Sequence, residues 1–175
     1  MSKSPLPQVL VQVEAFHPVD ENIKSLQLFL PLLHPNTSLQ VSAPYTQIGK
    51  LAEAFKGQIV TVGANEMLSA APSTFTGSIA AKLVKAFDAQ FVLIPAKGAD
   101  AAEEAEGKAA REKIESALKE NITPYVCLIE SWEEHHDELT KKAMDGRLKQ
   151  TLGGLPQETL KRLTTAYKAD WIVTA

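Results

Sequence analysis

Short apolar, β-branched runs alternate with longer amphipathic runs along this chain, and that alternation limits its fold more than any other feature. The strand-like runs are QVLVQV (8–13), SLQVSA (38–43), QIVTVG (58–63), AQFVLI (89–94), PYVCLI (124–129) and LTTAY (163–167). The helix-like segments lie around 20–33, 46–56, 77–87, 101–119, 133–150 and 156–162. Strands and helices that alternate in this way form parallel sheets. The sequence therefore predicts an α/β fold with about six parallel strands.

Composition favours one globular domain over residues 1–175, because 45% hydrophobic content in a chain of this length is enough to bury a core. The 18 basic residues are scattered and the formal charge is -3, so we expect no nucleic-acid partner.

The longest apolar runs fall far short of the ~20 residues that span a bilayer, and MSKSPLPQ lacks a signal peptide's apolar core. We expect no membrane partner. Cys127 is the single cysteine, which favours a reducing, cytoplasmic location.

The common cofactor motifs are missing from the sequence. It has no GxGxxG, no GxxxxGK[ST] and no GxSxG. The glycines that dinucleotide-binding, P-loop and α/β-hydrolase sites require are therefore missing. The run EEHHDE (133–138) suggests a metal site at first sight. Adjacent helical residues, however, point about 100° apart, so His135 and His136 would not face one ion. We expect neither a cofactor nor a metal.

Three stretches carry a family resemblance. VGANEMLSAAPSTFTGSIAAKLVKAFDAQFVLI (62–94) resembles the third strand, the FTGE loop and the following helix of the triosephosphate isomerase family. YVCLIESWEE (125–134) is similar to that family's CIGE segment, and RLKQTLGGLPQETLKRLTTAYKADW (147–171) to its long helix and AYEPVW strand. The resemblance covers roughly residues 7–175. It implies an incomplete (β/α) barrel with six strands, because the complete barrel has eight and needs about 250 residues. Strands seven and eight, with the phosphate-binding loops that follow them, are expected to be missing.

The resemblance also shows which catalytic groups have changed. The family uses an Asn and a Lys after strand one, a His after strand four and a Glu after strand six, and is itself a standard example of environment-tuned acid–base catalysis. In VEAFH (13–17), Val13 and Ala15 stand at the Asn and Lys positions. Ala96 stands at the His position, and Lys168 replaces the Glu. We therefore expect a pseudoenzyme without isomerase activity that serves as a binding or structural protein.

Three other positions match the family. Glu130, Tyr167 and Trp171 correspond to the residues that hold the family's sixth loop open and shut. The alternative is that they persist only as packing, since aromatic residues beside a strand usually belong to the core. The apolar tail DWIVTA (170–175) is expected to extend the sixth strand.

An open barrel leaves two sheet edges uncovered, which is a liability for a monomer. The segment NEMLSAAPSTFTG (65–77) resembles the family's projecting dimer loop and predicts a homodimer, through this loop or through the open edges. The residues of interest in the loop are Asn65, Thr74, Phe75, Thr76 and Gly77. The sheet could otherwise flatten or be filled by N-terminal residues. A small-molecule or protein ligand of unknown identity is also compatible with the sequence.

A catalytic alternative stays open. Residual isomerase activity is one form of it. The other is carbonyl chemistry in which Lys168 acts as an amine nucleophile, with its pKa lowered by burial and by Lys97 on the loop after strand four.

Overall fold

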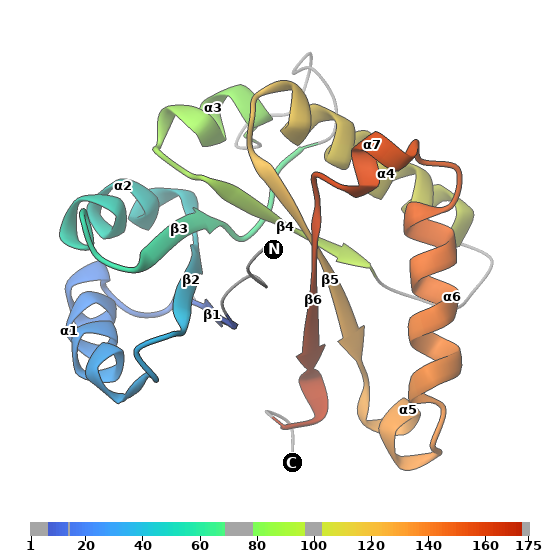
Figure 1. The fold of residues 1–175 in the computed structure, drawn as a ribbon, viewed down its shortest axis with the longest axis horizontal. Helices are drawn as coiled ribbons and strands as arrows, with labels where there is room; N and C mark the ends of the chain where they lie inside the picture. Colours follow the sequence, from blue (N-terminus) through green and yellow to red (C-terminus); the bar gives the residue numbers. More distant parts are fainter. Residues whose placement is uncertain (1–6, 14, 69–78, 97–102, 173–175) are drawn as a thin grey trace, which may run out of the picture.

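The computed structural model describes residues 7–13, 15–68, 79–96 and 103–172. Within them, six strands form one parallel sheet in the order β1-β2-β3-β4-β5-β6, which confirms the expected fold class (Figure 1). The strands are β1 Gln8–Gln12, β2 Ser38–Ala43, β3 Val60–Ala64, β4 Phe91–Ala96, β5 Thr123–Glu130 and β6 Thr164–Ala169. Because each strand pairs with the next along the chain, all carboxyl ends lie at one rim of the sheet. β1 and β6 are the two open edges.

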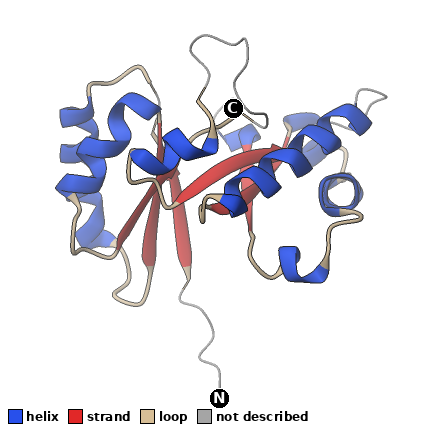
Figure 2. Ribbon diagram, turned by 90° about the horizontal axis from the view of Figure 1, so that it is seen from above, coloured by secondary structure: helices blue, strands red, loops and turns tan. Residues whose placement is uncertain are grey.

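Helices connect successive strands and lie around the convex side of the curved sheet, as two views show (Figures 1 and 2). Those of the first half are α1 Val19–Phe29, the 3-10 turn η1 Leu30–Leu32, α2 Tyr45–Ala54 and α3 Ala81–Ala86. Those of the second half are α4 Glu103–Lys119, α5 Trp132–His136, α6 Thr140–Leu152, α7 Gln157–Leu160 and the 3-10 turn η2 Asp170–Ile172. No helix of the described segments is long and apolar enough to cross a membrane.

The two faces of the sheet have different cores, because side chains alternate along each strand. The helix-covered face carries the main core, where Leu39, Val41 and Val126 are completely buried. The opposite face has a small cluster in which the rings of Phe91 and Tyr125 stack with centroids 4.5 Å apart. Gly63 permits this, since a Cβ at that position would lie 2.5 Å from the Phe91 ring.

Two expectations about element bounds were wrong. The helix expected over 133–150 is divided into α5 and α6, and Glu138 between them has a φ of 57°, which a continuous helix does not allow. The first part of the tail expected to extend β6, Asp170–Ile172, forms η2 instead, because the Trp171 indole folds back to hydrogen-bond the Glu130 carboxylate. The rest of that tail, 173–175, lies outside the described residues. The packing of one side chain therefore outweighs the strand tendency of residues 170–172.

Candidate functional site

The carboxyl ends of the strands are the place where ligands bind in barrels of this kind, so the predicted site residues are described from that rim. Val13 follows β1 and is 6% exposed; its N–H donates to the Ser42 carbonyl over 2.8 Å. Ala15 is exposed in the same connection. Ala96 ends β4 and is 2% exposed. None of these three side chains has a polar atom, so none can orient a substrate carbonyl or move a proton.

Lys168 lies in β6, where it is in register with Ile129 of β5. Its Nζ is 2.7 Å from Asp170 Oδ1, and both side chains are partly exposed. The ammonium group of Lys168 is therefore held in an ion pair at the carboxyl end of the sheet. Lys97, which was expected to lie near Lys168, falls outside the described residues.

Glu130, the last residue of β5, is the centre of a hydrogen-bonded cluster, which we call the Glu130 cluster and define by Glu130, His135, Thr140, Tyr167 and Trp171. The residue is completely buried. Oε1 accepts from the Thr140 hydroxyl, and Oε2 accepts from the Tyr167 hydroxyl and, over 2.8 Å, from Trp171 Nε1. The structure thus brings together the three residues that the sequence resemblance grouped, and adds two more.

The donors determine the charge of this carboxyl. Hydrogen bonds from Thr140 and Tyr167, then from Trp171, lower the pKa of Glu130 from 4.5 to about 2, against the opposing effect of burial. The same carboxylate raises the pKa of Tyr167. Glu130 is therefore an anion held by fixed donors, which suits it to hold β5, β6 and η2 together rather than to exchange protons with a substrate.

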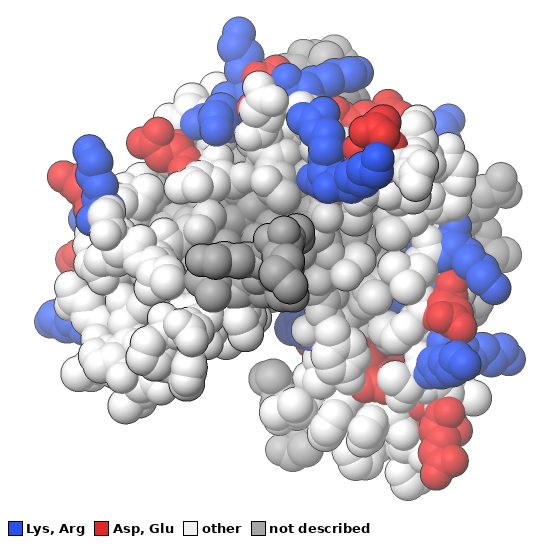
Figure 3. All heavy atoms as spheres, viewed as in Figure 1, with Lys and Arg blue, Asp and Glu red and all other residues white. Residues whose placement is uncertain are grey.

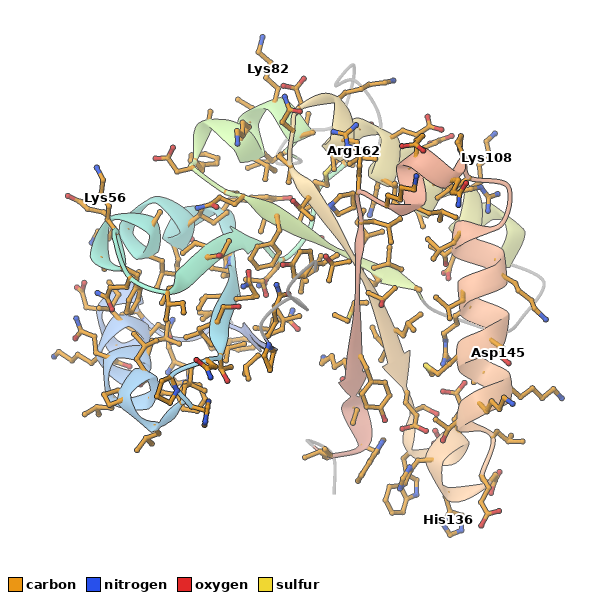
Figure 4. All side chains as sticks on the ribbon, in the orientation of Figure 1. Lys56, Lys82, Lys108, His136, Asp145 and Arg162 are labelled. Carbon is orange, nitrogen blue, oxygen red and sulfur yellow. The ribbon has the colours of Figure 1, made fainter. Side chains whose placement is uncertain are left out.

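Two histidines of α5 stack on two different tryptophans. The His135 ring lies 3.9 Å from the Trp171 ring, and its Nδ1 is 3.6 Å from Glu130 Oε2. His136 stacks on Trp132 with centroids 5.8 Å apart and lies at the tip of α5, on the outside of the molecule (Figure 4). The two rings thus point in different directions, as the sequence indicated. Among the described residues, no group of three or more histidine, cysteine or acidic side chains could hold a metal ion.

A second polar arrangement caps the α5 helix and fixes it to α6. Ser131 caps it in a capping box with Glu134, whose carboxylate accepts from the Ser131 N–H over 3.0 Å. Arg147 of α6 donates two hydrogen bonds to the same carboxylate, over 2.7 and 3.0 Å. The Arg147 and Glu134 side chains are 8% and 17% exposed. This buried pair orients α5, and through His135 it supports the Glu130 cluster.

Asn65, expected at the base of a dimer loop, follows β3 and donates from Nδ2 to the Val13 carbonyl over 3.0 Å. It borders a pocket of about 210 Å³ with Ala15, Ala43, Pro44, Tyr45 and Glu66. The other dimer-loop residues, Thr74, Phe75, Thr76 and Gly77, lie outside the described residues.

Charged side chains do not gather into a binding stripe on the face seen in Figure 3, where both signs are dispersed around the periphery. Lys56, Lys82, Lys108 and Asp145 are exposed, and Lys56 and Lys82 point away from the sheet (Figure 4).

Sequence reasoning missed His135, Thr140 and the Glu134–Arg147 pair as parts of this region. Only the pattern Ser131-x-x-Glu134, typical of a capping box, could have indicated where α5 begins. Thr140 and Arg147 lie far from Glu130 in sequence and carried no local signal.

Comparisons with known proteins find the same family that the sequence resembles. A family model described as triosephosphate isomerase matches residues 11–174. A triosephosphate isomerase of Protochlamydia amoebophila is 27% identical over 99% of this chain and 66% of its own length. One from Clostridium beijerinckii is 26% identical over 89% of this chain and 63% of its own. The crystal structure of triosephosphate isomerase from Bartonella henselae superposes with a TM-score of 0.71 at 17% identity, covering 93% of this chain and 68% of the other. The chain thus spans about two thirds of the length of these relatives.

Proposed function

This chain belongs to the triosephosphate isomerase family, and from that premise we propose that it is a non-catalytic member whose role is to bind or to support a partner. The main support is the chemical nature of the side chains at the carboxyl ends of the strands. Where the family resemblance places an Asn, a Lys and a His, the chain has Val13, Ala15 and Ala96, which are hydrocarbon side chains. Such groups cannot polarise a carbonyl or neutralise a phosphate. Catalytic groups of one site act as a unit, so their joint replacement removes nearly all rate enhancement.

The position of the family's glutamate base supports the same proposal. Lys168 occupies it, and its ammonium is paired with Asp170 at 2.7 Å. An ammonium in an ion pair has no lone pair with which to take a proton from substrate. The same pairing gives no support to the alternative in which Lys168 attacks a carbonyl as a free amine.

The Glu130 cluster has been kept as a support, in our proposal, although the catalytic groups have changed. Its hydrogen bonds hold the segment after β6 against β5. In a protein without isomerase activity, this support shapes the rim of the sheet where a ligand would bind.

The same proposal includes a homodimer formed through segment 65–77 or through the edges of β1 and β6, in a cytoplasmic protein. Unpaired edge strands offer backbone donors and acceptors to another chain. Multi-angle light scattering checks this, and a monomer that persists from high to low protein concentration would exclude the dimer.

The test of the function is turnover of glyceraldehyde 3-phosphate in a coupled assay, with the purified protein and a Lys168→Ala variant measured in parallel. We expect the same background rate from both, since any activity common to both comes from contaminating host enzyme. Activity that is present in the natural protein and lost in the variant would show that Lys168 carries chemistry and would overturn the proposal. Borohydride trapping with the same aldehyde gives a second reading: a covalent adduct that requires Lys168 would support the amine-nucleophile alternative.

A further inference from the structure

The six strands of the sheet are not joined equally. Among the described residues, β3 and β4 are in register only at Gly63 with Phe91 and at Ala64 with Val92, whereas β2 pairs with the whole of β3 and β5 with the whole of β4. From this joint β3 and β4 diverge towards their amino ends (Figure 1). The sheet therefore consists of two well-paired halves, β1–β3 and β4–β6, that are connected by one short joint.

A pocket of about 830 Å³ lies between the two halves where β3 and β4 diverge, and we call it the wedge. Val60 and Val62 of β3 line it on one side, and Gln90, which precedes β4, lines it on the other. The Gln90 N–H donates to the Val62 carbonyl over 2.9 Å at the end nearest the joint. The second half of α2 and the end of α3 supply further walls, so the wedge lies on the helix-covered side of the sheet.

The two walls of the wedge carry complementary charges. Glu53 and Lys56 lie near the end of α2, and Lys85 and Asp88 lie near the end of α3. The two helices run in the same direction, because each connects parallel strands, so the acid–base order of one wall faces the base–acid order of the other. All four side chains are exposed, and none is in an ion pair within the described part of the chain. Narrowing the wedge would bring Glu53 to Lys85.

On the concave side of the sheet, the Tyr125 side chain crosses from the second half to the first. Its ring is nearly buried and stacks on Phe91. Its hydroxyl donates towards Gln40 Oε1 of β2 over 3.3 Å and towards Gln8 Oε1 of β1 over 3.4 Å. Burial raises the pKa of Tyr125, so the hydroxyl keeps its proton. These contacts hold the halves in the curved arrangement, and we call them the latch.

We propose that the sheet is a two-state device, hinged at the joint of Gly63 and Phe91, in which the latch and the wedge act on opposite sides of the hinge. In the structure the latch is formed and the wedge is open. When the latch releases, the halves rotate apart on the concave side, the sheet flattens, and the wedge narrows until Glu53 pairs with Lys85. Each state has contacts that the other lacks, which a two-state equilibrium requires.

The motion has a consequence for the carboxyl ends of the strands. Both halves contribute to that rim, where barrels of this kind bind their ligands, so flattening the sheet changes its width. The device goes beyond the proposed function and does not depend on it, because none of its residues occupies a catalytic position of the family.

Double electron–electron resonance between two spin labels measures the motion directly. Labels at Lys50→Cys on α2 and Asp145→Cys on α6 report across the hinge, and both positions are exposed. The two helices lie on opposite sides of the curved sheet, so flattening lengthens the distance between the labels (Figure 1). A control pair, Glu115→Cys on α4 with Asp145→Cys, reports within one half. The full chain is used in a Cys127→Ala background, because Cys127 is its single cysteine.

Two variants release the latch. Tyr125→Phe removes the hydroxyl and keeps the ring that stacks on Phe91. We expect a second, longer distance across the hinge whose population rises roughly two- to tenfold, the factor that one lost hydrogen bond corresponds to, while the control pair keeps its distance. Gln40→Met removes the acceptor and retains a side chain of similar length, so it should shift the same population in the same direction.

Charge reversal tests the wedge in the Tyr125→Phe background. Lys85→Glu places two acids across the wedge and should reduce the longer-distance population, and adding Glu53→Lys should restore it. Lys82→Glu, on the same helix but pointing away from the sheet, has the same effect on net charge and should leave the population unchanged (Figure 4).

An unchanged distance across the hinge in both Tyr125→Phe and Gln40→Met would overturn the inference, because the two halves would then move as one body. A change that appears equally in the control pair would also contradict it, since it would show general loosening and not rotation about the joint. Equal effects of Lys85→Glu and Lys82→Glu would exclude the ion pair across the wedge and with it the proposed second state.

Discussion

The indole N–H of Trp171 donates a 2.8 Å hydrogen bond to the carboxylate of Glu130, joining the turn after the last strand of the sheet to the end of its neighbour. Tyr167 donates to the same oxygen from within β6. A single buried carboxylate thus determines where β6 ends and how η2 begins.

Removing the charge of Glu130 should weaken the hydrogen bond that holds η2 against β5. In Glu130→Gln, the carboxylate that receives the Tyr167 and Trp171 donors becomes a neutral amide, whose N–H₂ group faces some of those donors. In a Trp132→Phe background Trp171 is the single tryptophan, and with excitation selective for tryptophan we expect its emission to shift to longer wavelength as water reaches the indole. The melting temperature should fall as well. Glu112→Gln, at an exposed position of α4, is the control and should leave both unchanged.

Acid should destabilise the protein through the same group. The pKa of Glu130 is lowered from 4.5 to about 2 in the folded protein, so the unfolded chain binds the proton more readily. The contribution to stability is present above pH 4.5 and is lost as the pH falls from there towards 2. Denaturant unfolding between pH 6 and pH 3 measures it. The Glu130→Gln variant should show a flatter pH dependence over this range, and equal slopes would contradict the assignment.

Two glycine substitutions should have opposite effects. In Gly63→Ala the new Cβ would lie 2.5 Å from the Phe91 ring, which is held by its stack on Tyr125, and we expect a loss of about 1–3 kcal/mol from this overpacking. In Gly49→Ala the Cβ meets no atom within 4 Å inside α2, so the helix should gain about 1 kcal/mol. Urea unfolding of both variants checks the sign of each.

The Glu134–Arg147 ion pair should contribute more to the free energy of unfolding than exposed residues on the same helix. Arg147→Ala leaves a mostly buried carboxylate without its two hydrogen bonds, and we expect a loss of about 3 kcal/mol, the low end for a broken buried pair. Lys149→Ala, on an exposed part of the same helix, should change the free energy of unfolding by less than about 0.5 kcal/mol. Similar losses in both variants would mean that the pair contributes little.

Much of the fold could be predicted because strand and helix periods are local. The SLQVSA run is β2 residue for residue, and the other strands differ by only a few residues at their ends. The order of the strands followed from the family resemblance, which is also local in sequence. The errors arose where a distant contact decided the backbone: Trp171 turns away from β6 to reach Glu130, and a residue with positive φ, Glu138, divides the helix expected over 133–150.

The candidate site was only partly predictable for the same reason. Glu130, Tyr167 and Trp171 could be grouped through the resemblance, but Thr140 and His135 join them only in the folded chain. The pocket bordered by Asn65 had no sequence signal, because residues from three separate connections meet there only in the folded chain.

The most direct test of the account is proton exchange itself: incubate the purified protein with a triose phosphate in D₂O and follow loss of the carbon-bound proton next to the carbonyl by ¹H NMR. This measures the step that an isomerase base performs, without a coupling enzyme. The account predicts an exchange rate equal to that of buffer, because Val13, Ala15 and Ala96 offer no polar group and Lys168 is paired with Asp170. Exchange that scales with protein concentration and disappears in Lys168→Ala would contradict it.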